Sequence, residues 1–314
     1  MTIKRNDLRG GPGGDSLVPK NLTADIWKDA LENAIVPGLA KSTPIIFGDN
    51  EVPMMTKRPA ASIVGEGEQM KGTDMEVGSK KLHTVKARAG MEFTRETVEE
   101  NPAHVLDALA EEISGAITRQ IDLAVMHGRQ ASDGAQLTGG EQYLRQAGKV
   151  VQIDPSSPDE IDAALWEGYA KIVDDRGAMT GAAIDPRLTA ILAQARYPDG
   201  RRVYPEISMS GASVGPFSSL STGVGKVVSG QVDASESTDI IAIAGDYTAL
   251  RFGHALNIPV KKVEYGDPLG NGDLQGRDCV AYLATAHIGW GIMDLAKFVR
   301  YELATGNGGD GSGE

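Results

Sequence analysis

A long apolar periodicity near residue 100 is the feature that most limits how this chain can fold. Asn101 is a good helix N-cap, Pro102 suits the first helical position, and Gly128 ends the pattern. Between them apolar residues recur at spacings of three and four, which is the repeat of one helix face: Val105, Leu106, Leu109, Ile113, Ile117, Ile121, Ala124 and Val125. We therefore expect a helix over 102–128, a rod of roughly 39 Å. That is well above the usual helix length.

The stretch before this helix predicts a long, projecting two-stranded hairpin over 61–93. Its return half alternates between apolar and polar side chains, which is the period of a strand. One face carries Val85, Ala87, Ala89, Met91 and Phe93, and the other carries Thr84, Lys86, Arg88 and Glu92. The central part, residues 67–78, has few apolar residues and cannot bury a core of its own. Because an isolated ribbon is marginal in water, we expect it to rest on a neighbouring subunit.

The other segments give shorter signals. We expect an N-terminal arm over 1–20, a short amphipathic helix at 23–31 and an extended stretch at 32–60. The apolar face of the 23–31 helix is Ile26, Trp27, Ala30 and Leu31. From about 130 to 275 the pattern is mixed, with helices at 158–173 and 187–196, strands at 182–184 and 239–244, and Gly- and Ser-rich loops at 208–230. Residues 279–301 are strand-like, and the chain from 306 onward is a flexible tail.

Composition excludes several classes of protein. The net charge is −12 and the longest cationic run is a pair such as Lys80-Lys81, so the basic footprint of a nucleic-acid-binding protein is absent. Cys279 is the only cysteine, which excludes an intrachain disulfide and a thiolate metal cluster. No apolar stretch reaches 18 residues, and the N-terminus has no apolar signal region. We therefore expect no membrane association.

Catalytic motifs are weakly supported. Residues 211–215 fit G-x-S-x-G, the nucleophile elbow of hydrolases, which would make Ser213 a nucleophile. That elbow needs a strand before the Ser and a helix after it, and neither context fits, so a chance match is favoured. Residues 267–278 resemble a calcium loop, but Leu269 and Asp278 stand at ligand positions three and twelve, so we interpret them as a turn. The sequence predicts no enzyme activity, no cofactor and no metal site.

Several segments, taken in order, match one family. These are Ala61–Gly67 and Leu82–Phe93 as outbound and returning loop strands, 102–128 as a spine helix ending in Asp122–Gly128, and the turns at 184–186, 199–201, 214–216 and 245–247. Their order resembles the major capsid proteins of tailed bacteriophages with the Hong Kong 97 type fold. Each motif is weak alone, but the resemblance covers nearly the whole chain.

The resemblance implies an α+β fold of the Hong Kong 97 type. The implied organisation is an N-terminal arm (1–45), a peripheral domain (46–60 and 92–130) with the spine helix at 102–128, an extended loop hairpin (61–91), an axial domain (131–275), a return through the peripheral domain (276–304) and a flexible tail (305–314). Only about 20 residues precede Leu22, so we expect a separate scaffold protein or none, unless the sequence is already processed.

The implied function is a major capsid protein that self-assembles through pentamers and hexamers into an icosahedral shell around viral double-stranded DNA. Its location would be the virion capsid, assembled in the host cytoplasm, and its partners further copies of itself with separate scaffold, portal and decoration proteins. DNA would be enclosed without sequence-specific binding. The candidate inter-subunit contacts are the hairpin charges Glu66, Glu68, Lys71, Lys80, Lys81, Lys86 and Arg88. Two alternatives stay open, an encapsulin-type bacterial compartment shell and, more distantly, a Ser hydrolase.

Some family members crosslink covalently, joining a loop Lys to an Asn on a neighbour with a nearby Glu as base. Lys71, Lys80 or Lys81 would supply the amine here. At the positions that align with the Asn and the Glu stand Asp278 and Thr285. Because an ionised carboxylate is a poor acyl acceptor and Thr is no general base, we expect no autocatalytic crosslinks.

Overall fold

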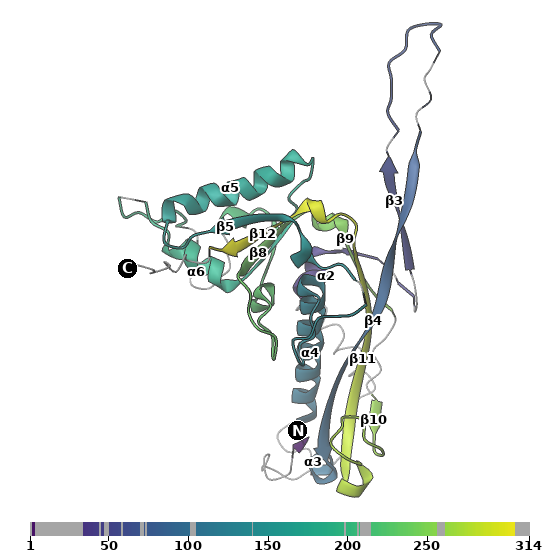
Figure 1. Cartoon of the computed structure of the whole chain (residues 1–314). Helices are drawn as coiled ribbons and strands as arrows, with labels where there is room; N and C mark the ends of the chain where they lie inside the picture. The colour runs from purple at the N-terminus through teal and green to yellow at the C-terminus, as the bar shows by residue number, and fades with distance from the viewer. Residues whose placement is uncertain are drawn as a thin grey trace, which may run out of the picture.

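The structure is a computed structural model that describes residues 2–3, 34–43, 45–46, 50–57, 59–69, 72, 74–100, 105–139, 141–197, 199–205, 207, 215–255 and 261–304. Within these residues the strands form two sheets, one of seven strands and one of five. The two sheets lie in separate halves of the molecule, and a thin hairpin projects from one of them (Figure 1). None of the described helices is long and apolar enough to cross a membrane.

The larger sheet is built around one long strand pair. Strand β4 (Glu76–Thr94) runs antiparallel to β11 (Cys279–Ile292), from Thr94 opposite Cys279 to His83 opposite Trp290. Around this pair lie β1 (Thr2–Ile3), β2 (Lys41–Ser42), β3 (Asn50–Lys57), β9 (Leu250–Ala255) and β10 (Lys261–Val263). Helix α3 (Arg95–Glu100) follows β4, and helix α4 (Val105–His127) runs along the sheet (Figure 1). The expected α+β class is thereby confirmed.

Helix α4 and the larger sheet share one apolar core. The helix buries Ile113, Ile117, Ile121 and Val125, in the spacing that the sequence predicts for one face. From the sheet come Ala87 and Phe93 of β4 and a row of apolar residues of β11. The expected alternation of β4 holds, since Lys86 and Arg88 are exposed on the other face; Glu92 is the exception, because it is buried in an ion pair.

The smaller sheet has the strand order β5-β12-β8-β6-β7. These strands are β5 (Lys149–Ile153), β6 (Gly181–Ile184), β7 (Ser221–Val224), β8 (Ile240–Gly245) and β12 (Phe298–Leu303). Helices α5 (Pro158–Asp174) and α6 (Pro186–Gln194) pack on it through Leu165, Ile172, Leu188 and Leu192. Short 3-10 turns occupy Leu144–Gln146, Gly215–Phe217, Lys226–Ser229, Tyr247–Ala249, Gln275–Arg277 and Leu295–Lys297.

Most of the expected elements are confirmed with small changes in their ends. The helix expected over 102–128 is α4, Val105–His127, and residues 101–104 lie outside the described residues. The helices expected at 158–173 and 187–196 are α5 and α6, and the strands at 182–184 and 239–244 are β6 and β8. Residues 4–33 of the expected arm, which include the predicted helix at 23–31, and the tail at 305–314 lie outside the described residues. At the start of that arm, Thr2–Ile3 form β1 beside β4.

The outbound strand of the hairpin was predicted in the wrong place. The partner of β4 is β3, Asn50–Lys57, in a register that sets Asn50 opposite Leu82 and Met54 opposite Gly78. Residues 59–69 form no strand, and all of them are exposed. The physical reason is that Ile63 and Val64, the large apolar side chains of 61–69, stay exposed, whereas Val52 packs on the buried Leu82 and Ile45 at the hairpin base.

Three smaller expectations also need correction. Residues 32–60 are not wholly extended, because α2 (Ile35–Leu39) is a short helix. The region 208–230 is not only loop, because β7 pairs parallel to β6. The strand-like stretch 279–301 is two strands, β11 and β12, which the turn at Leu295–Lys297 carries into different sheets.

The division into domains stays a prediction, but the strand pairing cuts across its boundaries. Strands β9 and β10 fall within the 131–275 segment yet pair with β11 in the larger sheet. Strand β12 falls within the 276–304 return yet pairs with β5 and β8 in the smaller sheet. The chain therefore passes between the two halves more often than a linear division suggests.

Helix α2 is held in place by a buried carboxylate on α4. Asp122 Oδ2 accepts the Ile35 N–H at 2.8 Å and Oδ1 accepts the Val36 N–H at 2.9 Å. A Cβ on Gly223 would collide with the Ile35 side chain, so α2 also lies directly on β7. The strap of residues 34–42 therefore joins α4 to the smaller sheet and ends as β2 on β9. Burial raises the pKa of Asp122 to about 6, against the lowering effect of the two N–H donors.

His127, at the end of α4, is buried as well. Its Nε2 lies 2.9 Å from the Val228 carbonyl oxygen, and Gly230 in the left-handed conformation packs against the ring. Burial lowers the pKa of His127 to about 4, and the nearby Arg145 and Arg129 act in the same direction. The ring is therefore neutral at physiological pH, with Nε2 as the donor.

Asp122 and His127 change the free energy of unfolding in opposite directions as pH falls from about 6.5 to 4. The pKa of Asp122 is higher in the folded chain than its ordinary 3.8, so this carboxyl adds stability as pH falls from about 6 to 4. The pKa of His127 is lower than its ordinary 6.5, so its contribution is complete above pH 6.5 and is lost as pH falls to about 4. The two contributions largely cancel.

We predict that single substitutions expose each contribution. In Asp122→Asn only His127 of this pair titrates, and the free energy of unfolding falls by about 2–3 kcal/mol between pH 7 and pH 4 relative to the unsubstituted chain. In His127→Gln it rises by a similar amount. Urea unfolding of the unassembled subunit at pH 4, 5, 6 and 7 measures both, with the double variant as the flat control. Parallel pH profiles for Asp122→Asn and the unsubstituted chain would contradict this account.

Candidate inter-subunit surfaces

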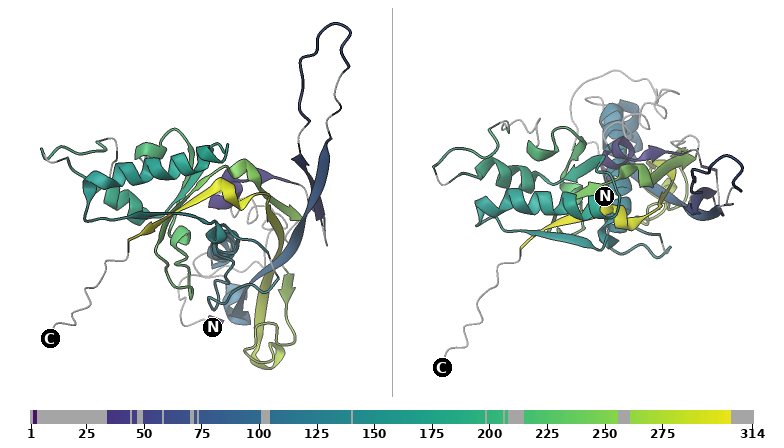
Figure 2. Two further views of the ribbon diagram at one scale, coloured as in Figure 1. Left: turned by 45° about the horizontal axis from the view of Figure 1, so that its top comes forward. Right: turned by 90° about the horizontal axis from the view of Figure 1, so that it is seen from above.

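The hairpin of β3 and β4 stands clear of the rest of the molecule. The views in Figure 2 show it projecting beyond both sheets, with the exposed residues 59–69 at its far part. Among its described residues, a buried apolar cluster lies at the base of the hairpin, where Val52 packs on Leu82 and Ile45. A ribbon of this kind gains little stability from its own contacts, so its long exposed surface is available for another molecule.

Acidic side chains mark the far part of the hairpin. Glu66 is exposed beside Gly67, which takes the left-handed conformation of the turn at φ 85°. Glu68 serves the turn itself, because its N–H donates to the Gly65 carbonyl at 3.1 Å and its carboxylate accepts the Gly65 N–H at 3.1 Å. Of the predicted contact residues, Glu66 and Glu68 therefore lie together at one turn. Lys71 lies outside the described residues.

Lys80 and Lys81 lie near the base of the hairpin, away from that turn. Lys80 Nζ donates to Gln142 Oε1 of the same chain at 2.6 Å. Burial lowers the pKa of Lys80, while Asp294 raises it. Lys81 is exposed and stands opposite Glu51 in the β3–β4 register. Lys80 thus ties the hairpin to the body of its own subunit.

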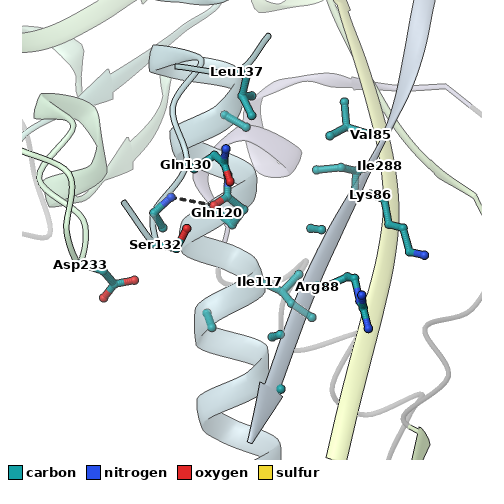
Figure 3. A pocket seen from close by; sticks show the side chains of 16 residues that line it. Val85, Lys86, Arg88, Ile117, Gln120, Gln130, Ser132, Leu137, Asp233 and Ile288 are labelled. Atoms are coloured by element: carbon teal, nitrogen blue, oxygen red, sulfur yellow. Dashed lines mark hydrogen bonds between the residues drawn. The ribbon is translucent and has the colours of Figure 1, made fainter. Parts of the chain in front are cut away.

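Lys86 and Arg88 belong to a basic cleft on the outer face of the larger sheet. Figure 3 shows both side chains pointing away from α4. Across the sheet Lys86 stands opposite His287, and Arg88 opposite Thr285. With Lys261 and Leu283 these residues line a cleft of about 270 Å³. Burial, and then the Lys86 charge, lower the pKa of His287. We name the set Lys86, Arg88, Lys261 and His287 the basic cleft.

The sequence reasoning missed Lys261 and His287, and it named Thr285 only as a position aligned to a crosslinking site. The pairing of β4 with β11 joins segments almost 200 residues apart in the chain, and no local pattern specifies that register. A signal was nevertheless present, since Leu283, Thr285 and His287 alternate with Ala284 and Ala286. In the structure the first three are half-buried and the alanines are buried.

A buried carboxylate fixes the lower end of β4. Glu92 is 1% exposed, and its carboxylate accepts Arg277 Nη1 at 2.6 Å and Asn271 Nδ2 at 3.1 Å. Cys279 lies beside Glu92. Burial is the main cause that raises the pKa of its thiol, and a hydrogen bond with Glu92 is the second. Glu92 thereby pins the loop at 264–278 against the sheet beneath the basic cleft.

The two positions that were aligned to a crosslinking site have other partners. Asp278 Oδ1 accepts Arg95 Nε at 2.7 Å, which ties the loop to α3. Thr285 stands opposite Arg88 in the basic cleft. The absence of covalent crosslinks stays a prediction.

The smaller sheet carries an exposed apolar patch that the sequence reasoning did not single out. Trp166, Tyr169 and Val173 follow one another along α5 and are 58%, 43% and 44% exposed. The Trp166 and Tyr169 rings meet edge to face, with centroids 5.7 Å apart. Beside them Phe217, Met179 and Leu220 line a hollow of about 320 Å³. Grouped exposed apolar side chains mark interaction surfaces, and we name this set the α5 patch.

The candidate catalytic motif does not gain support. Ser213 lies outside the described residues, and the segment after it, Gly215–Phe217, is a single 3-10 turn in place of the helix that a nucleophile elbow requires. Of residues 267–278, which the sequence predicts as a turn, 267–272 contain no helix or strand and Gln275–Arg277 form a 3-10 turn. In the described part of the chain no three His, Cys, Asp or Glu side chains gather as metal ligands would.

Comparison with known proteins gives one consistent result. The model of the phage capsid family matches residues 14–303. No functionally curated protein matches the sequence.

Solved structures share the fold. A chain from Gordonia phage Cozz is 48% identical, with 87% of each chain covered and a TM-score of 0.79. A chain from Mycobacterium phage Ogopogo is 28% identical, covering 87% of this chain and 92% of that one at a TM-score of 0.71. The capsid of a native GTA particle is 11% identical over 94% of both chains with a TM-score of 0.55, a similarity of fold alone.

We predict that Arg277 matters more to stability than its exposure suggests. Arg277→Ala leaves the buried Glu92 carboxylate without its cation and should lower the free energy of unfolding. Glu92→Gln removes the charge itself and should cost less, and the double variant should be more stable than Arg277→Ala. Urea unfolding of the unassembled subunit tests this order. Arg201→Ala, which breaks an exposed pair with Asp199, is the control and should change stability by under about 0.5 kcal/mol.

Proposed function

Because this chain belongs to the phage capsid family, it is a major capsid protein that forms an icosahedral shell, and we propose that it assembles through pentamers and hexamers around viral double-stranded DNA. The observation that carries this function is the family match over residues 14–303, together with 48% identity to the Gordonia phage chain. The capsid family is one of structural proteins, and we assign no catalytic step to the chain.

We propose an inter-subunit contact between the acidic turn of one hairpin, which carries Glu66 and Glu68, and the basic cleft of another copy. The two surfaces cannot meet within one subunit. Residues 76 to 86 belong to the same continuous strand, so about 33 Å of β4 separates the start of the hairpin from Lys86. The segment 59–69, which contains Glu66 and Glu68, connects β3 to β4 beyond that start (Figure 1). Only a neighbouring subunit can therefore bring the opposite charges together.

The expected strength of this contact suits reversible assembly. An exposed ion pair contributes about 0–1 kcal/mol, so two or three pairs give a weak contact. Each subunit of a shell makes such contacts with several neighbours, and multivalency turns weak contacts into a stable particle. Of the seven predicted contact residues, we now assign Glu66, Glu68, Lys86 and Arg88 to this contact. Lys80 and Lys81 would support the hairpin base, and Lys71 remains a candidate.

The α5 patch is proposed as a second contact, within the ring of subunits around one axis. It lies in the half of the molecule opposite the hairpin (Figure 1), so the two contacts can form at the same time. Its apolar character complements the charged contact of the hairpin, because apolar burial gives affinity while charge pairs give register.

The remaining partners and the place of assembly follow from this function. We propose that subunits assemble in the host cytoplasm, with separate scaffold, portal and decoration proteins. The chain carries a net charge of −12 and no basic run. A shell of such subunits would enclose DNA without binding its phosphates tightly, which favours packaging and release. Co-purification with DNA or scaffold supports a phage shell, whereas a cargo enzyme would indicate an encapsulin-type compartment.

We predict that the purified protein forms closed shells, or rings of five or six, in negative-stain electron microscopy. Deletion of residues 60–73 should leave a folded subunit that does not form shells, because the deletion removes the acidic turn and no described core residue. Assembled shells of the unsubstituted chain should run as one 33 kDa band on a denaturing gel. A covalent ladder on that gel would overturn the expectation of no crosslinks.

We also predict that the charge pairing can be reversed. Lys86→Glu with Arg88→Glu should raise the protein concentration needed for assembly at least about tenfold. Glu66→Lys with Glu68→Lys should do the same. Combining all four should restore assembly, measured by light scattering. Lys226→Glu, an exposed cation remote from the cleft, is the matched control. Four substitutions that are no better than two would show that these surfaces do not meet.

A further inference from the structure

The basic cleft gathers cations from the two strands that flank the lower part of β11. Strand β11 pairs with β4 along one edge and with β10 along the other. Lys86 and Arg88 come from β4. Lys261 comes from β10, where it stands opposite Leu283 of β11. Because side chains directly opposite one another in a sheet lie about 5 Å apart, this register brings three cations to one small area of a single face.

The cations of the cleft lack an acidic partner among the described residues. The cleft is lined by Lys86, Arg88, Lys261, Leu283, Thr285 and His287, and no carboxylate lines its described part. Other cations of the same sheet and its loops form ion pairs: Lys262 with Glu264, Arg277 with Glu92 and Arg95 with Asp278. Within the part of the chain that the structure describes, no ion pair includes Lys86, Arg88 or Lys261.

These charges give the basic cleft a positive potential. A cleft lined by one sign of charge attracts counter-ions more strongly than an open surface, because its low-dielectric walls focus the field. The field acts inside the cleft, since the Lys86 charge, after burial, lowers the pKa of His287. Like charges at neighbouring positions of a sheet also repel one another. A bound anion would reduce this repulsion, so the folded subunit would gain stability from binding.

The side chains of the cleft suit a tetrahedral oxyanion of the phosphate class. The guanidinium of Arg88 can donate two parallel hydrogen bonds to two oxygens of one anion. The ammonium groups of Lys86 and Lys261 add point charges, and the Thr285 hydroxyl can donate one further hydrogen bond. The cleft volume of about 270 Å³ is several times the roughly 30 Å³ that one water occupies in the liquid. It therefore has room for a small polyatomic anion.

We propose that the basic cleft is a binding site for one small tetrahedral oxyanion, inorganic phosphate or sulfate, held between Arg88 and Lys86 of β4 and Lys261 of β10. A free anion is favoured over the backbone of duplex DNA, because the chain as a whole carries a net charge of −12 and would repel a long polyanion. Binding is a property of the single subunit and does not rest on shell assembly.

Titration of the unassembled subunit with sodium sulfate or sodium phosphate, at an ionic strength held constant with sodium chloride, tests the site. The amide NMR signals of residues 86–88 and 285–287 should shift and saturate with a dissociation constant of about 1 mM. Arg88→Gln should weaken binding at least about tenfold, and Arg88→Lys, which keeps the charge but not the fork, should weaken it less.

Lys262→Gln is the matched control for these variants. It removes one positive charge from β10, but Lys262 stands opposite Tyr282 and so lies on the other face of the strand from Lys261. Its binding of sulfate should be unchanged. Shifts that never saturate, or a loss of binding in Lys262→Gln equal to that in Arg88→Gln, would indicate general screening of charge and would overturn the site.

A short DNA duplex distinguishes the two sources of phosphate. At an equal concentration of phosphate groups, the duplex should shift the signals of residues 86–88 much less than inorganic phosphate does. Larger shifts with the duplex would show that the cleft contacts DNA and would overturn the assignment to a free anion.

Binding at this site also predicts a competition, which rests on the proposed hairpin contact. The anion and the acidic turn of another copy would occupy the same cleft, so phosphate should raise the protein concentration needed for assembly relative to chloride of equal ionic strength. Light scattering measures this concentration. Saturable binding to the subunit without any effect on assembly would support the anion site and contradict the hairpin contact, whereas an absence of binding would overturn the site itself.

Discussion

The antiparallel ladder between β4 and β11 is the contact on which the rest of the structure depends. It joins residues 83–94 to 279–290 and sets which side chains face α4 and which face outward. Because strand side chains alternate, a shift of one residue would turn Ala87 outward and Arg88 toward the helix. The apolar core under α4 and the basic cleft both follow from this register.

The length of β4 separates two functions within one strand. Its second half is an internal strand of the core, whereas its first half pairs, among the described strands, with β3 and projects from the molecule. The transition lies at Leu82, which is buried on Ile45 and Val52 and lies near Lys80, bonded to Gln142. Because its base is anchored in this way, the hairpin can present its charged side chains to another subunit while its own fold stays intact.

Buried carboxylates hold two connecting segments of the molecule in place. Asp122 holds the strap of residues 34–42, and Glu92 holds the loop at 264–278, each through two donors. A buried carboxylate of this kind adds little net stability, but the loss of its partner is costly. These sites therefore specify where the segments attach, while the stability comes from apolar packing under α4 and in the smaller sheet.

Local pattern was sufficient for much of the fold. The three- and four-residue spacing predicted α4, the alternation predicted the second half of β4, and the order of weak motifs indicated the capsid fold. The outbound strand was misplaced because β3 is recognised by its partner Leu82 and not by any strong period of its own. The candidate contacts were incomplete for the same reason, since Lys261 and His287 join Lys86 and Arg88 only across the sheet.

The sequence by itself determined the long helix, the charged hairpin, the acidic balance and the family, because these depend on residue type and spacing along the chain. The tertiary structure decided the strand partners, the burial of Asp122, His127 and Glu92, and the gathering of charges into the basic cleft. The physical reason is that a local period fixes which way a side chain points relative to its neighbours in the chain. Only pairing between distant segments fixes what it meets there.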